Sequence, residues 1–164
     1  MKNIFVLSAL GFSCGLPYML VFSTLSAWLR DAGAALTVIG FISWAALTYS
    51  LKFLWSPFVD RIKMPLNQVV GQRRSWILMM QLLILILIMM MSQFDPISSL
   101  NFIVITAVLI AFFGSLQDIA VDAYRIELVS LDEQGNLAAS YQFGYRLSIL
   151  VATSLALIFA DFVS

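Results

Sequence analysis

WILMMQLLILILIMMMS occupies residues 76–92, and its run from Leu82 to Met91 contains no polar residue. An α-helix rises about 1.5 Å per residue, so about 20 apolar residues cross the 30 Å hydrocarbon core of a membrane. The whole chain has this character, because 62% of its 164 residues are apolar and only 11% are charged. Soluble domains carry about 25% charged residues, and a chain this short has no core large enough for so much apolar surface. The sequence therefore predicts an integral membrane protein.

The composition excludes several classes of site and partner. The chain has no histidine, which excludes an imidazole base and histidine metal ligands. Cys14 is the only cysteine, so the chain can form neither an internal disulfide nor a cysteine metal cluster. The formal net charge is zero, which excludes a nucleic-acid binder that relies on bulk electrostatics. We expect no metal, no cofactor and no soluble domain.

Five segments are long and apolar enough to be transmembrane helices, and polar stretches separate them. They cover residues 4–28, 37–58, 76–92, 100–124 and 137–161. None shows the alternation of apolar and polar residues that a membrane barrel requires, and backbone groups in lipid must find their partners within a helix. Residues 1–164 are therefore predicted to form one all-α integral membrane bundle of about five helices.

The positions of lysine and arginine predict the orientation of this bundle, because these residues gather in cytoplasmic loops. With a cytoplasmic N-terminus, Arg30 alone lies outside, and the inner residues are Lys2, Arg61, Lys63, Arg73, Arg74 and Arg125. A cleaved signal peptide is the alternative for the first segment, but its apolar stretch exceeds the usual length of about 7–15 residues. Five crossings would place the C-terminus on the far side and leave the bundle incomplete.

Charged residues inside the predicted membrane helices are the candidates for function, because each costs at least about 2.5–3.5 kcal/mol at the bilayer centre. Lys52, Asp118 and Arg146 share a depth of about 7–14 Å from the cytoplasmic boundary. The spacing i, i+3, i+7, i+10 places four residues on one face of the fourth segment: Ser115, Asp118, Asp122 and Arg125. One face of the fifth segment carries Gln142, Arg146 and Thr153, beside a stripe of Tyr141, Tyr145 and Ser148.

Two interpretations of these charges stay open. In the first, the two aspartates hold Lys52 and Arg146 in ion pairs that fix helix packing. In the second, the charges line a path for a substrate or a proton, since buried partners can tune the protonation of a carboxylate. Asp122 lies closer to the cytoplasmic boundary than Asp118, and there we expect Arg73 or Arg74 to hold it.

The first segment is interrupted by Gly11, Gly15 and Pro17. The two glycines form a small-xxx-small face, which lets two helices pack closely. Pro17 has no N–H, so the carbonyl of Ser13 loses its usual helical partner. Interrupted helices often mark the binding sites of transporters, although a kinked helix in any polytopic protein has the same pattern.

Short strings along the whole chain resemble successive signatures of the AmpG-type muropeptide permeases. These permeases belong to the major facilitator superfamily and are related to acetyl-CoA transporters. The strings lie at residues 11–17, 27–33, 51–57 (LKFLWSP), 72–76 (QRRSW), 117–125 (QDIAVDAYR) and 144–146 (GYR). Asp60-Arg61 and residues 71–74 are similar to the superfamily's loop motif between helices two and three, although about nine residues separate the two parts.

The resemblance implies a twelve-helix, proton-coupled importer that carries anhydro-muropeptides across the bacterial inner membrane for cell-wall recycling. It also implies a central cavity between two six-helix halves, and as partners membrane lipid, protons, a glycopeptide solute and a chain that supplies the missing helices. The candidate substrate or proton path consists of Lys52, Gln117, Asp118, Asp122, Gln142, Tyr145 and Arg146. The candidate structural residues are Gly11, Gly15, Pro17, Asp60, Arg61, Arg73, Arg74 and Arg125.

Other functions stay open beside this one. The solute could be acetyl-CoA or another small molecule that the same superfamily carries. A truncated gene product would be a membrane remnant that transports nothing. An intramembrane enzyme is disfavoured, because the chain has no histidine, no Gly-x-Ser-x-Gly string and no close aspartate pair on two different helices.

The charge count makes a direct prediction about topology. In a chain whose Cys14 has been replaced, a cysteine at Ala34 is expected to react with an impermeant thiol reagent added outside intact cells. A cysteine at Gln72 is expected to react only after the membrane is opened, because the basic 71–74 stretch lies in the cytoplasm. The reverse labelling pattern would contradict the predicted orientation.

Overall fold

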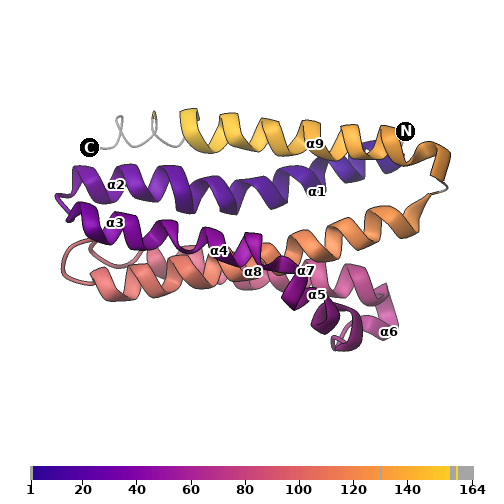
Figure 1. Ribbon diagram of the computed structural model, residues 1–164, viewed down its shortest axis with the longest axis horizontal. Helices are drawn as coiled ribbons and strands as arrows, with labels where there is room; N and C mark the ends of the chain where they lie inside the picture. Colours follow the sequence, from indigo (N-terminus) through magenta and orange to yellow (C-terminus); the bar gives the residue numbers. More distant parts are fainter. Residues whose placement is uncertain (1, 130, 156–157, 159–164) are drawn as a thin grey trace.

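The computed structural model describes residues 2–129, 131–155 and 158, and every regular element in these ranges is helical (Figure 1). The all-α prediction is therefore confirmed. In chain order the elements are α1 (Lys2–Met19), η1 (Leu20–Thr24), α2 (Leu25–Asp31), α3 (Leu36–Ser43), α4 (Ala46–Ser50), α5 (Lys52–Arg61), α6 (Asn67–Val70), α7 (Gln72–Met91), α8 (Leu100–Leu128), η2 (Leu131–Glu133), α9 (Gln134–Leu150) and η3 (Val151–Leu155).

The first predicted segment is one continuous helix, in which α1, η1 and α2 follow one another without a break. Its part Asn3–Asp31 has a mean hydropathy of 1.9 and is long enough to cross a membrane. Pro17 lies inside α1, and the wider π-helical turn η1 begins three residues later. Because Pro17 removes one donor from the hydrogen-bond ladder, a local widening is its expected effect. The interruption is therefore a π turn and does not divide the helix.

The second predicted segment, residues 37–58, is broken in the structure. Leu36–Ser50 and Lys52–Arg61 are bent by 53° relative to each other, and Leu51 between them has non-helical backbone angles. Pro57 cannot donate to the carbonyl four residues before it, which weakens the start of α5. The hydroxyl of Thr48 donates to the carbonyl of Ala45, a type of bond that bends helices. The second predicted segment is therefore a bent pair of helices, which is long and apolar enough to cross a membrane only when its two parts are taken together.

Three helices are long and apolar enough to cross a membrane, and there are four when the bent pair is counted as one span. The third and fourth predicted segments correspond to α7 and α8, both long enough to span. The fifth predicted segment, residues 137–161, corresponds to α9 and η3, and its end lies partly outside the described residues. The described residues therefore show three or four candidate spans, where the sequence predicts about five.

The helices pack as two layers, with α1 and α9 side by side above α7 and α8 (Figure 1). At three glycines, α1 and α9 approach each other so closely that a side chain would not fit without a shift of its neighbours. A Cβ atom built on Gly11 would collide with the carbonyl oxygen of Tyr141, and one on Gly144 with that of Ser8. A Cβ atom on Gly15 would meet the hydroxyl of Ser148. Glycine is therefore required on both sides of this helix pair.

The close contact between α1 and α9 can be tested at Gly144. Gly144→Ala is expected to destabilise the bundle by about 1–3 kcal/mol, because its methyl group would overlap the Ser8 carbonyl. Gly40→Ala is the matched control, since open space surrounds Gly40 in α3, and it is expected to stabilise by about 0.5–1 kcal/mol. Unfolding in detergent micelles, followed by circular dichroism, measures both. Equal effects of the two changes would contradict the close contact.

Candidate functional site

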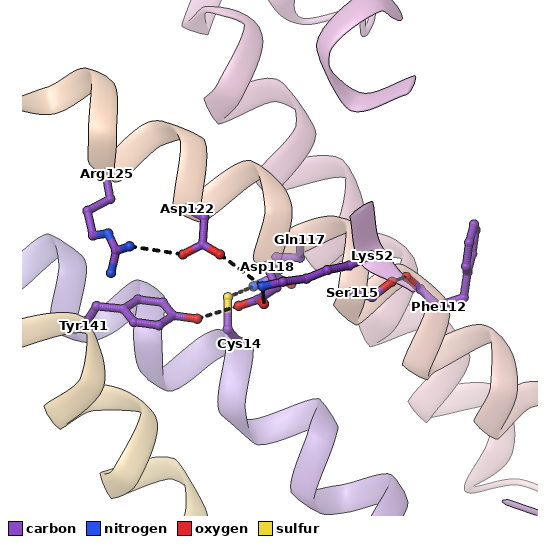
Figure 2. A network of polar contacts seen from close by, with 9 residues as sticks. All are labelled: Cys14, Lys52, Phe112, Ser115, Gln117, Asp118, Asp122, Arg125 and Tyr141. Carbon is purple, nitrogen blue, oxygen red and sulfur yellow. Dashed lines mark hydrogen bonds and ion pairs between the residues drawn. The ribbon is translucent and has the colours of Figure 1, made fainter. Parts of the chain in front are cut away.

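The bend before α5 brings Lys52 against α8. Its Nζ atom lies 2.8 Å from Oδ2 of Asp118 and 3.2 Å from Oδ2 of Asp122 (Figure 2). The exposed fractions of the three side chains are 41%, 17% and 35%, in that order. One ammonium group therefore bridges two carboxylates that stand one helical turn apart on α8.

The two carboxylates have further partners on α8 and α9. The hydroxyl of Tyr141 donates to Oδ1 of Asp118 across 2.6 Å. A guanidinium nitrogen of Arg125 lies 3.5 Å from Oδ1 of Asp122, and the same guanidinium lies over the ring of Tyr141. These contacts connect five residues that we call the Lys52 cluster: Lys52, Asp118, Asp122, Arg125 and Tyr141. The cluster joins α5, α8 and α9 (Figure 2). Two cations balance two carboxylates, so the cluster is electrically neutral.

Arg146 does not join this cluster, which corrects the expectation that an aspartate holds it. Among the residues that the structure describes, no carboxylate lies within 4.0 Å of its guanidinium. Tyr141 takes the position beside Asp118, and Arg146, five residues later, points about 140° away around the helix. Gln142 and Arg146 are both exposed, and Tyr145 is half-buried. Among the described residues, the face of α9 that carries Gln142 and Arg146 therefore forms no ion pair with the face of α8 that carries Asp118 and Asp122.

Asp122 is held by Lys52 and Arg125, so the expectation that Arg73 or Arg74 holds it was wrong. The Nη1 atom of Arg73 lies 2.6 Å from Asp60, and its Nε atom lies 2.9 Å from Glu127. Arg73 starts on α7 beside the end of α5, which places it closer to Asp60 than to Asp122.

Two other candidate structural residues, Arg61 and Arg74, follow directly on Asp60 and Arg73 in the chain. Arg74 donates to the hydroxyl of Tyr124 across 3.2 Å and also stacks on its ring. Arg61 is exposed at the end of α5. The indole N–H of Trp76 donates to the carbonyl of Ile62, which ties the start of α7 to the turn that follows α5. Polar contacts between α5, α7 and α8 therefore fix the end of the bundle that carries α6.

Gln117 is completely buried and belongs to a separate polar group. Its amide nitrogen donates to the hydroxyl of Ser13 across 3.0 Å and lies 3.5 Å from the sulfur of Cys14. Gln81 of α7 donates to the same hydroxyl across 3.0 Å. Ser13 in turn donates to the carbonyl of Leu10. This group joins α1, α7 and α8 in the middle of the bundle.

Sequence reasoning left three contributors out of the candidate list. Tyr141 lies on the stripe of residues beside Arg146. Its hydroxyl is at the depth of Asp118 in the predicted helices, which could have indicated a hydrogen bond between the two side chains. Glu127 follows Asp122 by five residues, so the face pattern on α8 gave no sign of it. Gln81 interrupts the apolar segment 76–92, and a lone amide in a membrane helix could have indicated a buried partner.

Protonation of a carboxylate in the Lys52 cluster can leave one of the two cations, Lys52 or Arg125, free to bind an anion. While both carboxylates are charged, they compensate Lys52 and Arg125 completely. A proton on one carboxylate leaves a net positive charge in a partly buried place, where Coulomb interactions are stronger than in water. The cluster then attracts an anion. A site of this kind can link proton movement to the binding of an acidic solute.

The strength of the cluster is testable by a double-mutant cycle on Lys52 and Asp118. Lys52→Ala is expected to destabilise by about 1–3 kcal/mol, less than a fully buried pair because Lys52 is partly exposed. Adding Asp118→Asn should recover part of this loss, since the uncompensated charge disappears. Unfolding in detergent measures the cycle, and Lys63→Ala, at an exposed residue, is the control. Strictly additive effects would show that the two groups do not interact.

Comparisons with known proteins place the chain in a family. The family described as Acetyl-coenzyme A transporter 1 matches residues 3–163. The anhydromuropeptide permease of Escherichia coli (strain K12) is 41% identical over 156 residues, which cover 95% of this chain and 31% of that protein. Putative transporter AmpG 4 of Rickettsia felis is 37% identical over 159 residues, which cover 97% of this chain and 38% of that protein. No solved structure matches the chain.

The chain thus spans about a third of the length of the curated relatives it matches. The family match extends over nearly all of its residues, and the described helices include several that can cross a membrane. The chain is a multi-pass membrane protein of a transporter family and not an enzyme, and it belongs to the acetyl-coenzyme A transporter and AmpG permease family of the major facilitator superfamily.

Proposed function

We propose that the chain is the N-terminal part of a proton-coupled importer that carries anhydro-muropeptides across the bacterial inner membrane for cell-wall recycling. The observation that carries this proposal is the Lys52 cluster, a neutral and partly buried group of two cations and two carboxylates. The similarity to the anhydromuropeptide permease supports the choice of solute. A muropeptide bears carboxylates on its peptide stem, and a protonated cluster attracts carboxylates.

The proposal includes the architecture: residues 1–164 form five crossings of a major-facilitator half, with a cytoplasmic N-terminus and no soluble domain. The arrangement of the helix ends supports this view. The N-terminus, the α6 turn and the connection between α8 and α9 lie at one end of the bundle, and the connection between α2 and α3 lies at the other (Figure 1). The first end carries most of the loop arginines and lysines, as a cytoplasmic end does.

The exposed polar face of α9 supports a water-filled cavity or a further protein segment beside it. Gln142 and Arg146 are exposed although they lie within a predicted membrane helix. A charged side chain in lipid costs at least about 2.5–3.5 kcal/mol, so this face avoids contact with lipid tails. The relatives are about three times as long as the chain, which leaves ample sequence to enclose such a cavity.

Asp118 and Arg146 take different roles in the proposed transport cycle. Asp118 is less exposed than Asp122, and its contacts with Lys52 and Tyr141, at 2.8 and 2.6 Å, are shorter than those of Asp122 with Lys52 and Arg125, at 3.2 and 3.5 Å. We assign the coupling proton to Asp118. The guanidinium of Arg146 offers a planar pair of donors that suits a carboxylate of the solute.

Acetyl-CoA is the second candidate solute, because the matching family is described as Acetyl-coenzyme A transporter 1. Its phosphates would also suit Arg146 and a protonated Lys52 cluster. Direct competition separates the two solutes: unlabelled muropeptide should displace labelled muropeptide from the transporter, whereas acetyl-CoA should not. The opposite result would favour the second candidate.

Uptake of labelled muropeptide into cells tests the proposed roles, with the chain joined to the remaining two-thirds of the E. coli permease. Asp118→Asn should abolish accumulation driven by a proton gradient and leave some exchange. Arg146→Lys keeps the charge but loses the two-point geometry, so uptake should fall about tenfold or more at unchanged protein level. Asp132→Asn and Arg30→Lys, both at exposed residues, are the matched controls.

Two outcomes of the uptake experiment would contradict the proposal. Normal gradient-driven uptake by Asp118→Asn would reduce the cluster to an ion pair that only fixes helix packing. No uptake by the unmodified chain, at a normal level of inserted protein, would favour a remnant that transports nothing.

A further inference from the structure

A cavity of about 460 Å³ lies between α5 and α8, and Lys52 and Asp122 of the Lys52 cluster line it. Its α5 wall carries Lys52, Ser56 and Asp60, which follow one another at intervals of four residues on one helical face. Its α8 wall includes Asp122 and Glu127. We call this space the α5–α8 groove. It runs from the Lys52 cluster to the ion pairs of Arg73 at the inner end of the bundle.

The groove carries an excess of negative charge. Its lining includes three carboxylates, on Asp60, Asp122 and Glu127, but only two cations, on Lys52 and Arg73. Asp118 and Arg125, the charged groups directly behind the lining, cancel each other and leave this excess unchanged. A cleft lined mainly by one sign of charge concentrates ions of the opposite sign. The lining itself therefore favours cations over anions.

The charged lining of the groove is unsuited to lipid tails. The side chains of Asp60 and Glu127 are 51% and 56% exposed, and Lys52 is 41% exposed. Each of these charges in contact with hydrocarbon would cost far more than its ion pair returns, and water in the groove would remove this cost. Asp60 of α5 and Arg73 of α7 line the groove at the end of the bundle that we assign to the cytoplasm.

We propose that the α5–α8 groove is an aqueous, cation-selective vestibule through which protons pass between the cytoplasm and the Lys52 cluster. This inference rests on the proposed function, because it supplies the inner branch of the proton path. Hydronium in the groove gives its proton to Asp122 and becomes water. Lys52 gives one of its three protons to Oδ2 of Asp118 and, as it does so, takes the proton of Asp122, so that it is an ammonium group again at the end of the step. The reverse sequence returns the proton.

The geometry fits this transfer. Asp122 lines the groove and Asp118 does not, while the Nζ atom of Lys52 lies within hydrogen-bond distance of both carboxylates. Asp118 is the least exposed of the three side chains. Water can therefore meet Asp122 directly, whereas a proton reaches Asp118 through Lys52. Ser56 lines the groove between the two ion clusters and can hold water there.

Cysteine labelling in cell membranes tests the vestibule without any transport measurement. In a full chain with Cys14→Ser, single cysteines replace Ser56 or Ala123, both half-buried residues of the groove lining. The controls are Leu54→Cys and Ile105→Cys, which are 47% and 61% exposed but lie outside the groove. A water-soluble trimethylammonium thiosulfonate and its sulfonate analogue are the reagents. Rates are divided by those of a free thiol.

Both groove cysteines should react with reagent present on the cytoplasmic side, and the two control cysteines should not, although they are more exposed. The cationic reagent should react about threefold or more faster than the anionic one at low salt. Glu127→Gln should bring that ratio close to one, because it removes the excess charge. Since uptake is not measured, failure of the proposed transport function would leave this result unchanged.

Three results would overturn the vestibule. Groove cysteines that stay unreactive, while a cysteine at Gln72 reacts, would show that lipid or protein fills the groove. Reaction without preference for the cationic reagent would exclude cation selection. Reaction only with reagent added outside intact cells would place the groove on the wrong side of the membrane.

Discussion

The structure depends most on one ammonium group placed between two carboxylates of α8. Lys52 could not lie inside a membrane helix without these partners, and it reaches them because the chain bends by 53° before α5. The bend carries α5 across α8 and opens the α5–α8 groove beside Asp122. The same bend brings Asp60 to Arg73, which joins α5 to α7. One charge requirement therefore sets the position of a whole helix.

Close packing of α1 against α9 holds the opposite side of the bundle together. Gly11 of α1 and Gly144 of α9 let the backbones of the two helices approach each other closely. Tyr141 belongs both to this contact and to the Lys52 cluster, since its carbonyl meets Gly11 and its hydroxyl bonds to Asp118. A change in the protonation of Asp118 therefore acts on a residue of the closest helix contact.

The sequence was sufficient to predict helices whose apolar character is continuous, such as α7 and α8, and the pairing of Lys52 with the aspartates of α8. Hydropathy and the cost of a charge in lipid decide these features locally. The bend before α5 and the partner of Arg73 depend on contacts between distant segments, which helical spacing does not encode. Arg146 shows the same limit, because depth alone did not reveal that Tyr141 would take its place beside Asp118.

The two ends of the bundle differ in a way that gives the site its direction. At the end that carries the connection between α2 and α3, Val21, Leu25 and Ile110 border a small apolar cavity of about 160 Å³, and Thr24 bonds to the carbonyl of Ala152 across the two π turns. At the opposite end, the polar α5–α8 groove meets both Lys52 and Arg73. The Lys52 cluster therefore borders a polar cavity toward the end that carries α6, and this is the side from which the proposed proton path reaches it.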